Sequence, residues 1–144
     1  MAEEKFYTRL EIEIQGFISK YGIDELIKWL REYSKIVSTS DFNTFHRIQR
    51  YTCEVYEIAI ADISSSNSTN INYSNAKKTI SYLSYTKTKL QQKHLTMLQS
   101  CTTRTIYNHI KEVQFRIKNP QGFREFIEKY NVILKKLEDH ASNP

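Results

Sequence analysis

The sequence contains few residues that break helices or close tight turns. Its 144 residues include three glycines and two prolines, both far below average usage. A sandwich or barrel of short strands needs a turn signal about every 8 to 12 residues, which this composition does not supply. The sequence therefore predicts an all-α fold, a helical bundle of long helices joined by short polar turns.

Long apolar runs and a cysteine framework are also missing. No stretch approaches the roughly 18 uninterrupted apolar residues of a membrane helix, and the N-terminus lacks the apolar segment of a secretory signal. We therefore expect a soluble, cytoplasmic protein with no membrane partner. The two cysteines, Cys53 and Cys101, suit reduced thiols better than a disulfide framework.

Acidic residues are nearly absent from one part of the chain. The net charge is +5, but residues 74 to 118 contain nine basic residues and one acidic residue. The nine are Lys77, Lys78, Lys87, Lys89, Lys93, Arg104, Lys111, Arg116 and Lys118. A surface kept basic only for solubility normally mixes both signs, whereas a one-sided excess is typical of a surface that binds phosphate groups.

Residues 1 to 40 have the pattern of a helical hairpin. Apolar residues recur every three or four positions from Phe6 to Tyr21, Gly22 is placed to end that helix, and Asp24 is placed to cap a second helix from Glu25 to Val37. The apolar faces are too broad to stay exposed on so small a unit. We expect them to form a homodimer interface or to complete the core of the chain.

Residues 41 to 144 are expected to form a second, helical domain. After a break and cap at Ser38-Thr-Ser-Asp, a helix should run from Phe42 to Glu57. The next segments are a helical turn, preferred over a short strand, from Ile58 to Ile63 and a polar loop from Ser64 to Tyr73. The remaining predicted helices run from a cap at Ser74 or Asn75 to Thr86, from Leu90 to Leu98, from Thr102 to Lys118 and, after the break at Asn119-Pro120, from Gln121 to Glu138.

The segment from residue 90 to residue 118 matches the requirements of a helix-turn-helix. That motif needs a short helix packed on a second helix, a turn of three or four residues, and polar side chains early on the second helix. Leu95 and Leu98 are placed to anchor the first helix, Cys101 to fill the turn, and Ile106 and Ile110 to bury the inner side of the second helix. We expect this second helix to enter the major groove of double-stranded DNA.

The predicted DNA contacts come from the second helix and from lysines around it. Hydroxyl, amide, imidazole and guanidinium groups near the start of the helix suit base edges and phosphates, and they belong to Thr102, Thr103, Arg104, Thr105, Asn108 and His109. The backbone amides at the helix N-terminus favour phosphate as well. Surrounding positive charge is expected from Lys77, Lys78, Lys89, Lys93 and Lys111.

The same residues resemble known DNA-binding patterns. Thr103-Arg-Thr-Ile-Tyr resembles the common regulator pattern in which a capped recognition helix continues Arg-Thr-Val-Tyr, although Ser100 stands where that pattern usually has glycine and Gln99 where it has an apolar residue. Three further features are Ala76-Lys-Lys-Thr-Ile-Ser-Tyr-Leu, the basic continuation after Thr103, and the closing Asn119-Pro-Gln-Gly-Phe with its amphipathic helix. With these features, residues 48 to 137 resemble the C-terminal DNA-binding domain of the bacterial replication initiator DnaA, a Trp-repressor-like helical fold.

Departures from that family limit what the resemblance implies. The family's Arg-Asp-His signature is replaced by Cys101, Thr102 and Thr103, so its recognition of origin sequences does not transfer to this chain. The chain has no glycine-lysine nucleotide-binding motif, which excludes ATP-driven initiation. The resemblance therefore implies the DNA-binding module alone.

Other classes of function find less support in the sequence. The histidines and cysteines have no spacing typical of a zinc site, and no nucleophile elbow or glycine-rich phosphate loop is present, so we expect no metal, no cofactor and no enzymatic activity. Two alternatives to duplex binding stay open. Tyrosines in or near the basic segment suit single-stranded nucleic acid, and the N-terminal hairpin suits a helical protein-protein interaction module.

Overall fold

A computed structural model describes residues 2–36, 39–63 and 70–142 of the chain. Every regular element in these ranges is helical, and no strand occurs in them. The predicted all-α class is therefore confirmed. The chain divides into two compact units, Met1–Ser38 and Thr39–Pro144.

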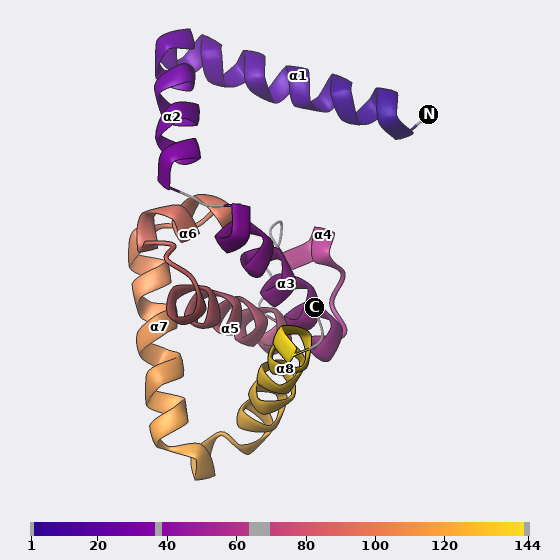
Figure 1. Cartoon of the computed structure of the whole chain (residues 1–144), viewed down its shortest axis with the longest axis vertical. Helices are drawn as coiled ribbons and strands as arrows, with labels where there is room; N and C mark the ends of the chain where they lie inside the picture. Colours follow the sequence, from indigo (N-terminus) through magenta and orange to yellow (C-terminus); the bar gives the residue numbers. More distant parts are fainter. Residues whose placement is uncertain (1, 37–38, 64–69, 143–144) are drawn as a thin grey trace. The chain divides into compact units, whose positions relative to one another are not determined.

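The first unit consists of α1, Ala2–Tyr21, and α2, Ile23–Ile36 (Figure 1). Gly22 ends α1 as predicted, because it adopts φ +89° and its amide donates to the Ile18 carbonyl at 2.8 Å. The predicted cap at Asp24 is wrong, because α2 already begins at Ile23 and Asp24 lies in its first turn. A carboxylate there still stabilises the positive end of the helix dipole.

The second unit is arranged around a central helix, α5, Ile71–Lys87 (Figure 1). The elements α3, α4, α6 and α7 all contact α5, and α8 packs on α3. Their bounds are Thr39–Tyr56 for α3, Ile60–Ile63 for α4, Gln92–Leu98 for α6, Thr103–Lys118 for α7, Pro120–Gly122 for the 3-10 turn η1 and Arg124–Ser142 for α8.

The core of this unit forms where the apolar sides of its helices meet α5. Ile80 and Leu83 of α5 are buried, and so are the inward side chains of its neighbours. These neighbours are Phe45 and Ile48 of α3, Leu95 of α6, Ile106, Ile110 and Val113 of α7, and Phe126 and Ile133 of α8. Burying one such side chain contributes about 1.5 to 3 kcal/mol, so this set is the main source of stability of the unit.

Two predicted boundaries in the first half of this unit are wrong. Thr39 to Asp41 do not form a break and cap but the first turn of α3, and Ser38 lies outside the described residues. Ile71 to Tyr73 are helical rather than part of the polar loop, because the Asn70 side chain accepts a hydrogen bond from the Asn72 amide at 2.8 Å and caps α5 there. The preferred helical turn before the loop is confirmed by α4.

Two later boundaries also differ from the prediction. The short helix begins at Gln92 rather than Leu90, because the side chains of Gln91 and His94 form a capping box at its start. The last helix begins at Arg124, because Pro120–Gly122 form a separate 3-10 turn after the predicted break at Asn119. These differences shift the ends of helices, whereas Leu95, Ile106 and Ile110 are buried as predicted.

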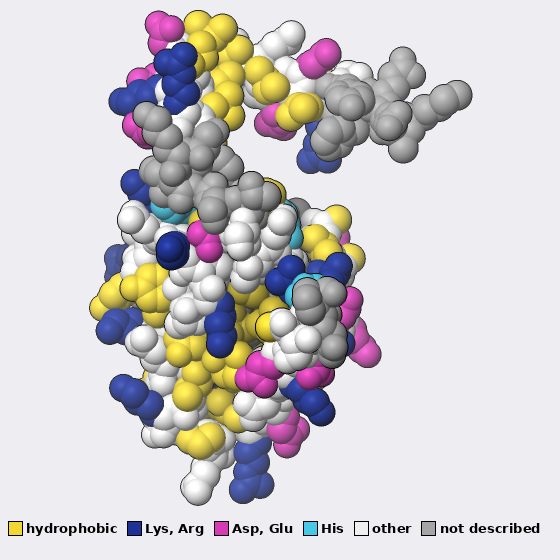
Figure 2. Space-filling view, viewed as in Figure 1, with side chains coloured by type: hydrophobic (Ala, Val, Ile, Leu, Met, Phe, Trp, Pro, Cys, Tyr) yellow, Lys and Arg dark blue, Asp and Glu magenta, His cyan; other side chains and the backbone are white. Residues whose placement is uncertain are grey.

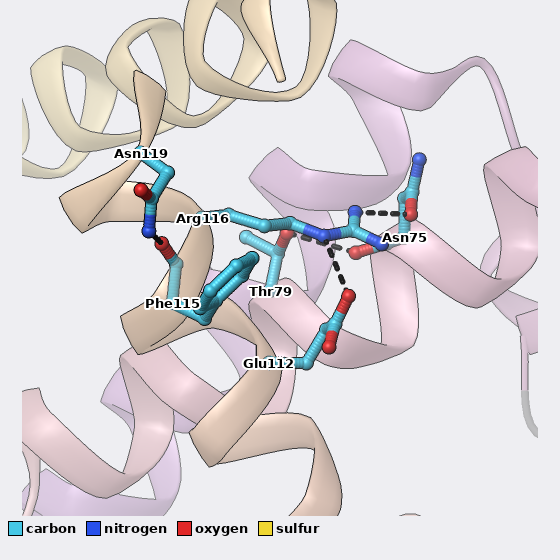
Figure 3. A network of polar contacts seen from close by, with 6 residues as sticks. All are labelled: Asn75, Thr79, Glu112, Phe115, Arg116 and Asn119. Carbon is cyan, nitrogen blue, oxygen red and sulfur yellow. Dashed lines mark hydrogen bonds and ion pairs between the residues drawn. The ribbon is translucent and has the colours of Figure 1, made fainter. Parts of the chain in front are cut away.

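A polar network holds α7 against α5 (Figure 3). Arg116 of α7 donates to the Asn75 side chain at 2.8 Å and to the Glu112 carboxylate at 3.2 Å. Its guanidinium also lies 5.0 Å and 4.8 Å from the ring centroids of Phe123 and Phe126. Its side chain is only 11% exposed, so Arg116 serves the fold and does not add to the basic surface.

Candidate nucleic-acid interface

Helices α6 and α7 are joined by a tight turn over residues 99 to 102. The amide of Gln99 donates to the Leu95 carbonyl at 2.9 Å, and the amide of Cys101 donates to the Thr96 carbonyl at 3.1 Å. Leu95 and Ile106 are fully buried, and Cys101 is half-buried, with the pKa of its thiol raised by burial. The two helices therefore share an apolar contact beside a closed turn.

Ser100 adopts an unusual backbone conformation within this turn. Its φ is +51°, in the left-handed region that favours glycine, and its side chain is exposed. Ser100 is the position at which the regulator pattern usually has glycine. The backbone of the turn thus has the conformation that a glycine at this position would accommodate without strain.

Threonines shape the beginning of α7. The Thr102 hydroxyl accepts a hydrogen bond from the Thr105 amide at 3.1 Å and lies 2.9 Å from the Thr105 hydroxyl, so Thr102 is the N-cap of the helix. The hydroxyl of Thr103 lies 3.5 Å from that of Thr96 on α6. Thr102 and Thr103 are exposed and Thr105 is half-buried. Two of the three predicted threonine contacts therefore lie on the surface at the helix N-terminus.

The outer side of α7 combines positive charge with aromatic rings. Apart from Ile117, its exposed side chains follow the helical repeat and line one face: Thr103, Arg104, Tyr107, Asn108, Lys111, Phe115 and Lys118. Dark blue and yellow side chains alternate along the left edge of Figure 2, over α7. The only carboxylate in the α7 sequence, Glu112, pairs with Arg116 instead.

Sequence reasoning missed Phe115 as a member of this outer face and considered Tyr107 only as a contact for single-stranded nucleic acid. Tyr107 is 49% exposed and Phe115 is 54% exposed, and the Lys111 ammonium lies 5.5 Å from the Tyr107 ring centroid. The signal was their spacing, because Tyr107 and Phe115 follow Arg104 and Lys111 at intervals of three and four residues. Aromatic rings on such a face suit contact with bases.

His109 does not point outward, although we expected it among the DNA contacts. It is half-buried, and its Nδ1 lies 2.8 Å from the hydroxyl of Ser81 on α5. The Gln99 side-chain amide also donates to that hydroxyl, at 2.5 Å. Burial, together with the charges of Lys78 and Lys77, lowers the pKa of His109 to about 4. The neutral imidazole is therefore part of the packing between α5, the turn and α7.

The predicted lysines differ in how far they are available to a partner. Lys89, Lys93 and Lys111 are exposed, whereas Lys77 and Lys78 of α5 are half-buried. Burial and the nearby Arg116 lower the pKa of Lys78. The structure thus groups Arg104, Asn108 and Lys111 on α7, places Lys93 on α6, and leaves the two α5 lysines partly covered.

Among the described residues, no group of three or more histidine, cysteine, aspartate or glutamate side chains could hold a metal ion. None of the helices in the described ranges is long and apolar enough to cross a membrane. Comparisons with known protein families, characterised proteins and solved structures find no match to this chain.

The titration of His109 predicts how stability depends on pH. Its pKa falls from 6.5 to about 4 on folding, so the unfolded chain binds the proton more tightly. The part of the free energy of unfolding that depends on a neutral His109 is fully present above pH 6.5 and is lost as the pH falls from about 6.5 to about 4. In urea unfolding, His109→Gln should therefore lose less stability than the parent chain over this range.

The exposed His46 offers the matched control for this measurement. His46→Gln should retain the pH dependence of the parent chain. His94, whose pKa burial also lowers, stays in both variants and leaves a residual slope. Equal slopes for His109→Gln and His46→Gln would contradict the role assigned to His109.

The left-handed conformation of Ser100 predicts a stabilising substitution. Ser100→Gly should raise the free energy of unfolding by about 0.5 to 1 kcal/mol, because glycine adopts a positive φ without steric cost. Ser74→Gly, inside α5, should instead lower it by about 0.5 kcal/mol, since glycine is a poor helix former. Chemical denaturation measures both, and a destabilised Ser100→Gly variant would refute the interpretation of the turn.

Proposed function

We propose that the chain is a non-enzymatic protein that binds double-stranded DNA, with α6 and α7 acting as a helix-turn-helix and α7 entering the major groove. The outer face of α7 is the observation that carries this proposal. It presents one guanidinium, two ammonium groups, a carboxamide and two aromatic rings on one side of a helix whose other side is buried. A helix of this kind supplies both phosphate attraction and groups that recognise bases.

Within this proposal, the side chains have separate roles. Arg104 and Asn108 lie four residues apart, near the N-terminal half of α7, and contact base edges. The hydroxyls of Thr102 and Thr103 and the exposed Lys93 contact phosphates. Tyr107 joins the base-contacting group, whereas the inward His109 supports α7 from behind.

The left-handed Ser100 supports the helix-turn-helix interpretation independently of charge. The regulator pattern usually has glycine at this position, and the backbone here has the conformation that favours glycine. The relation to the DnaA domain stays a prediction from the sequence. Our proposal therefore concerns the DNA-binding module and not a role in replication.

Single-stranded nucleic acid is a second candidate partner, because two exposed aromatic rings lie on the α7 face. Bases stack on exposed Tyr and Phe rings, and an adjacent ammonium such as that of Lys111 attracts the backbone. A helix, however, exposes its rings on a convex surface, whereas stacking platforms are usually sheets. Duplex DNA is for this reason the favoured partner.

Substitutions on α6 and α7 test the assignment. Binding of fluorescent duplexes, measured by anisotropy, should weaken steeply as salt rises. On a sequence selected from a random duplex pool, Arg104→Ala should cost about 1 to 3 kcal/mol, with little effect on random duplexes. Lys93→Ala should weaken binding to both alike, because it contacts phosphate only.

Arg124, exposed at the start of α8, provides the control for charge. Arg124→Ala should bind both duplexes as the parent chain does. An equal loss for Arg104→Ala and Lys93→Ala on every sequence would make the surface a nonspecific patch. Tighter binding to single strands than to the selected duplex would favour the second candidate, and no binding at low salt would refute both.

We also propose that the chain forms a homodimer through its first unit. A unit of 38 residues is too short to build a stable core of its own, and it exposes Ile23 and Ile27 on α2 and Leu10 and Ile14 on α1. A dimer would also let two recognition helices bind two half-sites of one duplex.

Light scattering of the full chain tests this association. The parent chain should be dimeric, and Ile27→Asp should shift it to the monomer because the substitution places a charge in the interface. Ile71→Asp, which alters an exposed isoleucine of the second unit, should leave the dimer intact. A monomeric parent chain at high concentration would show that the hairpin has another role.

A further inference from the structure

A second cationic cluster lies on α3, outside the basic segment that the sequence singles out. Asn43, His46, Arg47 and Arg50 are spaced by three and four residues and therefore line one face of α3. With Gln49 they border a hollow of about 370 Å³, which Ile60 of α4 and His140 of α8 complete. All of these residues belong to the second unit.

The size and form of this hollow suit a small ligand. Its volume lies near the lower end of the range for ligand pockets, about 300 to 1,000 Å³. In Figure 2, dark blue and cyan side chains lie together near the C-terminal end of α8, where that helix borders the hollow. Three helices that are distant in the sequence thus contribute side chains to one concave surface.

None of the ion pairs found among the described residues includes Arg47 or Arg50, and no carboxylate lines the hollow. Arg47 also borders a neighbouring hollow that Glu138 lines, whereas Arg50 faces this hollow alone. Arg50 lies over the Tyr51 ring, 5.1 Å from its centroid, and the Tyr51 hydroxyl lies 3.4 Å from His140 Nδ1. Residues 41 to 73 contain twice as many acidic as basic residues. A charge count along the sequence therefore does not indicate the cationic cluster on α3.

The donors around the hollow define the chemistry of its ligand. Guanidinium groups donate in a planar fork that matches phosphate oxygens, and carboxamides and imidazoles add further donors. Two guanidiniums repel a metal cation and suit a ligand with two negative charges better than a single carboxylate. Ile60 supplies an apolar wall that weakens competition from water.

We propose that this hollow binds a phosphate group, with Arg47 and Arg50 as its principal ligands and His46 and His140 as supporting donors. The phosphate belongs either to a free phosphorylated compound or to the backbone of a nucleic acid. The case of a free compound is independent of the function proposed for α7, because the two surfaces share no residue, whereas the nucleic-acid case rests on the DNA binding proposed above.

Calorimetric titration of the full chain with inorganic pyrophosphate, at constant ionic strength, tests the site. Binding should be saturable, and Arg47→Gln or Arg50→Gln should weaken it by about tenfold or more, the factor expected for one charge-assisted hydrogen bond. Arg124→Gln on α8 and Arg104→Gln on α7 remove the same charge elsewhere and should leave pyrophosphate binding unchanged.

Duplex DNA provides the second arm of the experiment. If Arg50→Gln weakens pyrophosphate binding and duplex binding together, the site holds a backbone phosphate. If it weakens pyrophosphate binding alone, the site holds a free phosphorylated compound. Absence of saturable pyrophosphate binding, or an equal loss in Arg50→Gln and Arg124→Gln, would overturn the proposal. Circular dichroism of each variant excludes unfolding as the cause.

Discussion

The orientation of α7 about its own axis is fixed by its buried apolar side chains and by one buried hydroxyl, that of Ser81. This group is fully buried, donates to the Lys77 carbonyl at 3.0 Å, and also contacts Gln99 of the turn and His109 of α7. A buried polar group that loses its partners costs about 1 to 3 kcal/mol, so these contacts hold His109 inward. Because successive side chains turn by about 100° around a helix, this orientation directs Arg104 and Lys111 to the outside.

Burial also decides how much of the basic segment is available to a partner. Arg116 lies in a network with Asn75 and Glu112 and packs against two aromatic rings. Its guanidinium is therefore engaged within the fold and is not available to a partner. Lys77 and Lys78 are half-covered by the packing of α5. The available charge therefore concentrates on α7 and around α6. A charge count along the sequence predicts a broad patch, whereas packing narrows it to a stripe along one helix.

The sequence alone predicted the end of a helix correctly where the backbone preference of a single residue decides it. Gly22 ends α1 because glycine adopts a positive φ without steric cost, and Asn119-Pro120 ends α7 because proline disfavours the helical conformation of the residue before it. The sequence alone did not predict whether a side chain at the edge of a helical face points inward or outward. His109 follows the outward Asn108 by a single residue, and only the partner on α5 decides its direction. The hollow at α3 depends on residues from α4 and α8, which no local pattern connects.

The two cationic surfaces differ in shape, and their shapes imply different modes of binding. The outer face of α7 is convex and mixes three charged groups with aromatic rings, so it can follow a polymer by contacting many groups weakly. The hollow at α3 concentrates two guanidiniums on one small volume, where a single anion satisfies both. Salt would weaken the many separate phosphate contacts of the first surface more steeply than the binding of one anion at the second, because each phosphate contact adds to the salt dependence. A protein with both surfaces would therefore keep its affinity for a single phosphate group while its affinity for a nucleic acid varies with ionic strength.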